Sequence, residues 1–416
     1  MNLSHLRGRA GWLALAAVLV LVAGLALTAR SLWPTRADAS TDPPTVAANS
    51  STSADPCEAS SREGCRSVRL SNGSQIRYVV LKSDDAQLDR AVVVDPGGPG
   101  LSILGAQWPD VIDDHLQAAL EDRPLVLVEE PWVTRQLPET CRQALRAWFT
   151  ATHRGTQPGD LVGPCEVADG QWGWTPQAYA EVLDSIAAQE GLSYEGFVGV
   201  SFGAHRFLYD AGRFQWAALA NPAPVHISGD QYLATRANGV WQMAARVAGG
   251  SLADLSARVT ARAAGLAAVE IDGRSTPVTG TDLGAAAIAL TYQHAETQQL
   301  GVVALLEDGG DPSLIGSLAD LTWMRYGEND ISPAYLAYLD EVCVAYGPWT
   351  PPPGADVVRE VLDAMHRPCS DVAETGQRAP VTSATVCVSH AVDDPVAPEG
   401  FAATWAPVGQ VIGRDV

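Results

Sequence analysis

Short apolar runs alternate with helical patterns between residues 67 and 226. Runs of four to seven residues, apolar through most of their length, predict strands at Gln75–Leu81, Ala91–Val94, Leu125–Val128, Phe197–Val200 and Trp216–Ala220. Helices are predicted between these strands, at Ala106–Leu120, Glu139–Thr150, Pro176–Gln189 and Phe202–Gly212. Buried strands that alternate with helices indicate an α/β fold, with a doubly wound and mostly parallel sheet.

The alternation stops at Ile227 and returns only near Ala384. The segment between them is rich in Ala and Leu with helical periodicity, and it predicts an inserted helical cap over residues 227–380. The sheet resumes with a strand at Ala384–Val388, a helix at Glu399–Trp405 and a last strand at Val408–Ile412. We therefore expect the core in two parts, residues 67–226 and residues 381–416, the second of them incomplete.

Residues 1–30 predict a signal peptide or a transmembrane anchor. Arg7 and Arg9 precede the uncharged run Ala10–Ala29, which as a helix is about 30 Å long and spans a bilayer. Both alternatives stay open, since Ala37-Asp38-Ala39 has the small residues of a cleavage site. Residues 31–66, rich in Ser, Thr and Pro, predict a flexible tether. Either alternative places the remaining chain outside the cytoplasm, with membrane contact through the N-terminal segment only.

The net charge excludes one class of partner, and the cysteine content indicates the compartment. A net charge of −21 repels phosphate backbones, so we expect no nucleic-acid partner. Seven cysteines suit an oxidising compartment. Their spacing predicts three local disulfides and one unpaired residue, with free buried thiols as the alternative: Cys57–Cys65, Cys141–Cys165 and Cys343–Cys369, with Cys387 left over. No Cys-x-x-Cys or His-x-x-x-His spacing occurs, so we expect no metal and no cofactor.

The main chemical signal is the string Gly199-Val200-Ser201-Phe202-Gly203, which follows an apolar strand and opens a helix. That setting is the one a nucleophile elbow requires, because a serine in a strained turn tolerates no bulky neighbours. The helix N-terminus also points at the oxygen that becomes negative during acyl transfer. We expect Ser201 to be the nucleophile; an ordinary glycine-rich turn is the alternative.

Two further loops follow predicted strands and complete a constellation. Gly97-Gly98-Pro99-Gly100 lets the backbone approach a substrate carbonyl, so the N–H groups of Gly98 and Phe202 are the expected oxyanion hole; a tight turn without a ligand is the alternative. Asp393-Asp394-Pro395-Val396-Ala397-Pro398 supplies the acid, in the order Ser then Asp. We prefer Asp394 because of the proline spacing; a helix-capping pair is the alternative.

These three motifs resemble the secreted tripeptidyl and prolyl aminopeptidases, a group of α/β-hydrolases. That family has a Gly-Gly-Pro-Gly oxyanion loop, a Gly-x-Ser-Tyr-Gly elbow, a late Asp-Pro-x-Thr-Pro motif and a helical cap with a cysteine pair, similar to Cys343 and Cys369. The similarity covers about Arg77 to Gly413. It implies an exported serine hydrolase with the α/β-hydrolase fold that releases short N-terminal peptides or proline.

The chain departs from that family in two places. The family's Asp-x-Arg-Gly-x-Gly loop is replaced by Glu129-Glu130-Pro131-Trp132-Val133-Thr134, which puts the substrate in doubt. The family's triad histidine follows the last strand, but no histidine follows His390, so we expect the catalytic base to be missing from this sequence. His390 and His226 are the substitutes to consider, although a structural role is expected for each. His205 is expected to pack behind the nucleophile.

Three functions therefore compete. The first is an aminopeptidase, which needs a carboxylate near the nucleophile to bind the substrate's ammonium group. Candidates for the substrate pocket are Glu130 and Trp132, with Glu307, Glu328 and Glu341 as acids of the cap. The second is a membrane-tethered binding protein on an inactive hydrolase scaffold. The third is an esterase or lipase, since a fold does not fix the leaving group. The expected ligand is a short peptide or a small ester.

Overall fold

The computed structural model describes residues 57, 64–82, 89–105, 120, 123–154, 156, 158–167, 170–271, 274, 276–326, 330–347, 349, 356–371, 383–391 and 393–414. The expected signal or anchor at 1–30, nearly all of the expected tether and nearly all of the helix expected at Ala106–Leu120 lie outside these residues. Within the described part, no helix combines the length and the apolar character that crossing a membrane requires.

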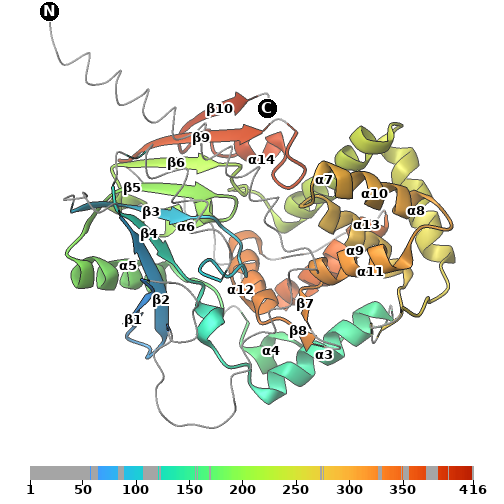
Figure 1. Cartoon of the computed structure of the whole chain (residues 1–416), viewed down its shortest axis with the longest axis horizontal. Coiled ribbons are helices and arrows are strands. Elements are labelled where there is room, and N and C mark those ends of the chain that lie inside the picture. Colours follow the sequence, from blue (N-terminus) through green and yellow to red (C-terminus); the bar gives the residue numbers. More distant parts are fainter. Residues whose placement is uncertain are drawn as a thin grey trace, which may run out of the picture.

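One large sheet organises the described chain. Its order is β1-β2-β4-β3-β5-β6-β9-β10, where β2 runs antiparallel to β1 and β4 and all other neighbours are parallel (Figure 1). The strands are β1 Arg66–Arg69, β2 Gln75–Leu81, β3 Arg90–Asp95, β4 Leu125–Val128, β5 Ser193–Val200, β6 Trp216–Ala220, β9 Thr385–Ala391 and β10 Gln410–Arg414.

The central strands are apolar because both faces of the sheet are covered. Along β3, Ala91 and Val93 point to one apolar cluster, and Val92 and Val94 point to another on the opposite face. Successive side chains of a strand alternate between faces, so a doubly covered strand is a continuous apolar run. The first cluster also holds residues of α5 Pro176–Glu190, α6 Gly203–Tyr209 and α14 Glu399–Ala403, which therefore cover that face.

A helical layer lies beside the carboxyl ends of the parallel strands (Figure 1). Between β6 and β9 the chain forms α7 Gly229–Ala248, α8 Leu252–Gly265, α9 Gly280–Leu290, α10 Ala295–Leu306, α11 Pro312–Thr322, α12 Ala334–Tyr346 and α13 Val357–His366. A two-stranded sheet, β7 Arg325–Tyr326 and β8 Asp330–Ile331, interrupts them. These helices share one apolar core with α3 Glu139–His153, which precedes the elbow in sequence.

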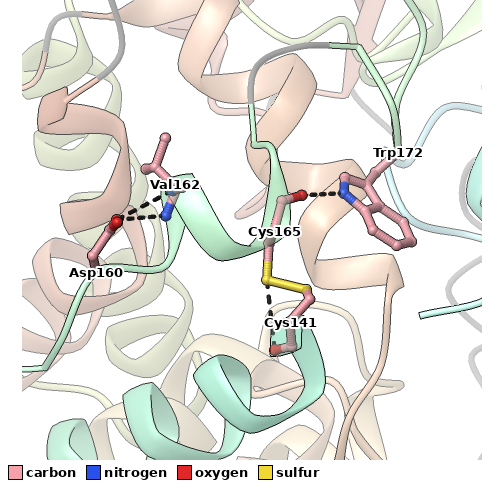
Figure 2. The surroundings of a disulfide bond; sticks show 6 residues. Cys141, Asp160, Val162, Cys165 and Trp172 are labelled. Atoms are coloured by element: carbon pink, nitrogen blue, oxygen red, sulfur yellow. Dashed lines mark hydrogen bonds between the residues drawn. A yellow bond between two sulfur atoms is a disulfide. The ribbon is translucent and has the colours of Figure 1, made fainter. Parts of the chain in front are cut away.

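Disulfides fasten the chain at three places. Cys57–Cys65, Cys141–Cys165 and Cys343–Cys369 are bonded, with Cα–Cα distances of 5.6, 4.7 and 4.9 Å, so the three predicted pairs are confirmed. The buried Cys387 is the unpaired cysteine. Figure 2 shows Cys141 of α3 bonded to Cys165 of the short helix α4, Val162–Cys165. The carbonyl of Cys165 accepts a hydrogen bond from the Trp172 indole.

The fold is the predicted one: a doubly wound α/β-hydrolase sheet with helices inserted before its last strands. The predicted bounds of β2, β4 and β6 match the structure, and β3, β5, α3 and α5 are longer than expected at one or both ends. The helix expected at Phe202–Gly212 ends earlier, at Tyr209, and is followed by the 3-10 turn Ala211–Arg213. β1, β7 and β8 were not predicted.

Candidate active site

Ser201 occupies the sharp turn between β5 and α6. Its φ is +51°, the left-handed conformation that side chains rarely adopt, and its N–H donates to the Ala220 carbonyl at 3.1 Å. A Cβ at Gly203 would lie 2.3 Å from the Asp95 carbonyl oxygen, and one at Gly199 would lie 3.1 Å from the Ala204 nitrogen. A side chain at Gly203 is therefore excluded, and one at Gly199 would be tightly crowded.

The glycine loop after β3 packs directly on this turn. A Cβ at Gly97 would lie 2.4 Å from the Val200 carbonyl oxygen and 3.1 Å from the Phe202 nitrogen, and φ is +89° at Gly97 and +133° at Gly98. Within the described chain, the N–H groups of Gly98 and Phe202 donate to no acceptor. The loop and the elbow thus bring together the two donors that were expected to form an oxyanion hole.

The acid loop follows β9 on the same side of the sheet. Asp394 is buried, and its Oδ1 accepts the N–H groups of Val396 at 2.7 Å and Ala397 at 3.1 Å. Asp393 instead faces solvent beside Arg246. Strands β5, β6 and β9 are consecutive, so about 10 Å separates the backbones where the Ser201 and Asp394 strands end. One imidazole can bridge side chains at that separation.

The three histidines near this edge differ in setting. His205 is buried, stacks on Phe202 and donates from Nε2 to the Pro224 carbonyl at 2.5 Å, and burial lowers its pKa to about 4. His226, after β6, is exposed and has a φ of +56°. His390 lies on β9, buried on the same face as Val388, with no hydrogen-bond partner for Nδ1 among the described residues. Within the described chain, no histidine is hydrogen-bonded to the Ser201 Oγ.

A buried ion cluster lies under the oxyanion loop. Arg206 of α6 binds Asp95 at 3.2 Å, Glu130 at 2.7 Å and Glu341 of α12 at 2.8 Å, with its side chain fully buried. Asp95 also accepts the Gly97 N–H at 2.9 Å and the Tyr179 hydroxyl at 3.1 Å. The cluster therefore connects β3, the loop after β4, α6 and the helix α12 through one guanidinium group.

Burial and neighbouring charges shift the pKa values of the cluster. Burial raises the pKa of Glu130 well above its usual value, and the neighbouring Glu341 and Asp95 add to the rise that Arg206 opposes. Burial also raises the pKa of Glu341. Burial alone would lower the pKa of Arg206, but the three carboxylates raise it well above its usual value. Glu130 Oε2 has no hydrogen-bond partner among the described residues.

Glu129, which sequence reasoning did not single out, holds the segment that directly follows the Gly97–Gly100 loop. Its buried carboxylate accepts the N–H groups of Ile103 at 2.7 Å, Leu104 at 3.2 Å and Glu130 at 3.0 Å, and the Ser102 hydroxyl at 2.9 Å. Burial raises the pKa of Glu129, and these hydrogen bonds oppose the rise. The sequence signal that could have identified it is a glutamate directly after the apolar strand β4.

The residues expected to line a substrate pocket differ in their surroundings. Glu130 and Glu341 are bound to Arg206 and have fully buried side chains. Trp132 lies in the 3-10 turn Pro131–Thr134, partly buried against the helical core. Glu307 is exposed at the end of α10, and Glu328 lies outside the described residues. Among the residues that the structure places, no three His, Cys, Asp or Glu side chains are grouped to hold a metal ion.

The chain is similar to known proteins only in comparisons of structure. No model of a protein family matches the chain, and a search of curated proteins found no match. The chain is similar to a hydrolase from Pseudomonas aeruginosa, with 12% identity, a TM-score of 0.34 and coverage of 84% of this chain and 89% of that one. It is also similar to naproxen esterase from Bacillus subtilis, with 12% identity, a TM-score of 0.33 and coverage of 84% of each chain.

A third similar structure is an esterase from Rhodococcus sp., with 15% identity, a TM-score of 0.34 and coverage of 84% of this chain and 90% of that one. Likenesses of this size carry no argument about the activity of this chain. The α/β-hydrolase fold is instead defined by the strand order and by the elbow at Ser201.

Proposed function

We propose that the protein is an exported serine hydrolase in which Ser201 attacks the carbonyl of a small acyl substrate. The observation that carries the proposal is the contact between the glycine loop and the elbow, where Gly97 leaves no room for a Cβ against Val200. The proposal is also supported by the N–H groups of Gly98 and Phe202, which donate to no acceptor among the described residues. Preorganised donors of this kind stabilise the tetrahedral oxyanion and contribute about 3–4 kcal/mol each in comparable enzymes.

The reaction would proceed through an acyl-enzyme. The Ser201 Oγ bonds to the carbonyl carbon, its proton passes to a base, and the carbonyl oxygen becomes the oxyanion. The protonated base then gives its proton to the leaving group as the tetrahedral carbon collapses to the ester of Ser201. Water repeats the cycle and releases the acid. We assign Asp394 the role of orienting and stabilising the charged base, with His226 and His390 as the histidines to test.

The buried acids favour esters over peptides with a free N-terminus. A peptide's ammonium group needs an accessible carboxylate, and Glu130 and Glu341 are already bound to Arg206 without contact with solvent. An ester needs only the oxyanion hole and an apolar pocket. Peptide release, the activity that the family resemblance implies, is the second candidate and would require Glu307, Glu328 or another acid near the site.

The test is hydrolysis of p-nitrophenyl acetate and butyrate, and of prolyl and tripeptidyl anilides, by the 416-residue chain. We expect ester turnover that Ser201→Ala abolishes and that Ser193→Ala, at the opposite end of β5, leaves unchanged. A fluorophosphonate should label Ser201 in the parent and not in Ser201→Ala. Turnover that survives Ser201→Ala would refute the proposal. Absence of both turnover and labelling, with saturable ligand binding, would favour the binding protein instead.

The base is tested separately with His226→Gln and His390→Gln. Loss of the triad histidine costs roughly six orders of magnitude in a comparable enzyme. A similar loss in one variant, with the other unchanged, would assign the base. If neither variant lowers a weak parent activity, added imidazole should raise it, because the base is then missing and an imidazole from solution can take its place beside Asp394.

A further inference from the structure

A cavity of about 80 Å³ lies within the helices that follow β6. Residues of α7, α9, α11, α12 and α13, and of the turns that follow α9 and α11, surround it. Among them are Tyr232, Arg236, Tyr292, Met324, Tyr338 and His366. A single enclosed water needs about 10–15 Å³ on this scale, so the cavity has room for several waters or for one small organic molecule. The Ser201 loop does not contribute to its lining.

Arg236 brings a positive charge to the wall of this cavity. The residue is 6% exposed. It donates from Nη1 to the Val396 carbonyl at 2.7 Å and from Nη2 to the Tyr292 hydroxyl at 3.0 Å. A guanidinium group has five N–H donors. Among the described residues, the acceptors of Arg236 are the Val396 carbonyl and the Tyr292 hydroxyl. No carboxylate of the described chain lies within ion-pair distance of Arg236, in contrast to the fully paired Arg206.

The other polar groups of the wall are neutral. The Tyr338 hydroxyl donates to His366 Nε2 at 2.6 Å, while His366 Nδ1 donates to the Leu362 carbonyl at 2.7 Å. Burial lowers the pKa of His366 to about 4, so its ring is uncharged at neutral pH. Asp394 acts on Arg236 electrostatically, but its Oδ1 is already occupied by the N–H groups of its own loop.

We propose that this cavity is a binding site for a small organic carboxylate with a flat apolar body. A buried cation without a paired carboxylate is costly, and an anionic ligand relieves that cost through charge-assisted hydrogen bonds to the guanidinium group. The tyrosine and histidine rings of the wall match the flat body. The Ser201 loop does not line the cavity, so its occupancy is measured by binding and the measurement does not depend on turnover.

The experiment is titration calorimetry of the 416-residue protein with benzoate at constant ionic strength, with benzamide as the neutral analogue of the same shape. We expect saturable one-site binding of benzoate and at least about tenfold weaker binding of benzamide. Arg236→Met should weaken benzoate at least about tenfold. Ala289→Met, which fills the cavity from α9 and keeps Arg236, should do the same and serves if Arg236→Met does not fold.

The matched control is Arg246→Met. Arg246 lies further along α7 and pairs with the exposed Asp393, so its loss should leave benzoate affinity unchanged. Equal affinities for benzoate and benzamide would overturn the proposal. Unchanged benzoate affinity in a folded Arg236→Met or in Ala289→Met would also overturn it, because binding would then lie elsewhere, for instance at the oxyanion hole. Absence of saturable benzoate binding would overturn it as well.

Discussion

Removing the guanidinium group of Arg206 should destabilise the protein more than any surface change of the same size. Arg206→Met keeps the aliphatic stem but leaves Asp95, Glu130 and Glu341 without their shared cation. Arg206 donates twice to Glu341, at 2.9 and 2.8 Å, and once to Glu130 at 2.7 Å. Breaking a buried pair of this kind costs about 3–5 kcal/mol in the free energy of unfolding.

The matched control is Arg213→Met, four residues after α6. Arg213 pairs with Asp184 and Asp210, whose side chains are 69% and 25% exposed, so screening by solvent limits the loss to about 1 kcal/mol. The second comparison is the double variant Arg206→Met with Glu341→Gln. It removes one stranded charge together with the cation, and it should recover part of the loss seen in Arg206→Met.

The assay is urea unfolding followed by tryptophan fluorescence at pH 6 and pH 9. The loss in Arg206→Met should be larger at pH 9, because the stranded carboxyls are then deprotonated inside the protein. A loss equal to that of Arg213→Met, or one independent of pH, would refute the reasoning. Either result would mean that the carboxylates find water when the cation is removed and that the cluster is not closed to solvent.

The remaining predictions concern the loops and the cap. Glu129→Gln should lower kcat for ester hydrolysis about tenfold or more with KM little changed, because one amide oxygen cannot hold the segment after the oxyanion loop as two carboxylate oxygens do; an unchanged kcat would exclude this role. Burial raises the pKa of Glu130, so its stabilisation is complete below about pH 4.3 and falls as pH rises through the folded pKa. Glu130→Gln should therefore flatten the fall of unfolding free energy with pH, and a parallel curve would contradict this. Replacing Cys343 and Cys369 by Ser should cost about 3–4 kcal/mol, from the 26-residue loop that they close, in the same unfolding assay; a cost under about 1 kcal/mol would show that the disulfide is dispensable.

Local patterns predicted the sheet because a strand that is buried on both faces is apolar at consecutive positions. β4 is Leu125–Val128, four apolar residues that are all buried, and its predicted bounds are those observed. β1 was missed because it is a short edge strand in which Arg66 and Arg69 surround one buried valine. The elbow was predictable for a different reason: its residues are consecutive in sequence between a strand and a helix, although the contact that excludes a side chain at Gly203 comes from Asp95 of β3.

The charge network beneath the site could not be derived from such patterns. The partners of Arg206 lie 76, 111 and 135 residues away along the chain, so no spacing rule connects them. Glu130 illustrates the consequence, since an acid beside the oxyanion loop was expected to face substrate and instead faces Arg206. The available signal was weaker: a charged residue within the apolar run that follows the elbow, where an unpaired charge would be too costly to bury.

Two of the buried arginines, Arg206 and Arg236, tie the helices after β6 to both loops of the candidate site. Arg206 joins Glu341 of α12 to Asp95, the residue that receives the Gly97 N–H of the oxyanion loop. Arg236 of α7 holds the Val396 carbonyl, and the N–H of that same residue binds Asp394. Separating these helices from the sheet would therefore expose an unpaired buried charge at one loop and release the acid at the other. The helices thus hold both loops of the candidate site, and substitutions of these arginines should change any activity of Ser201 as well as stability.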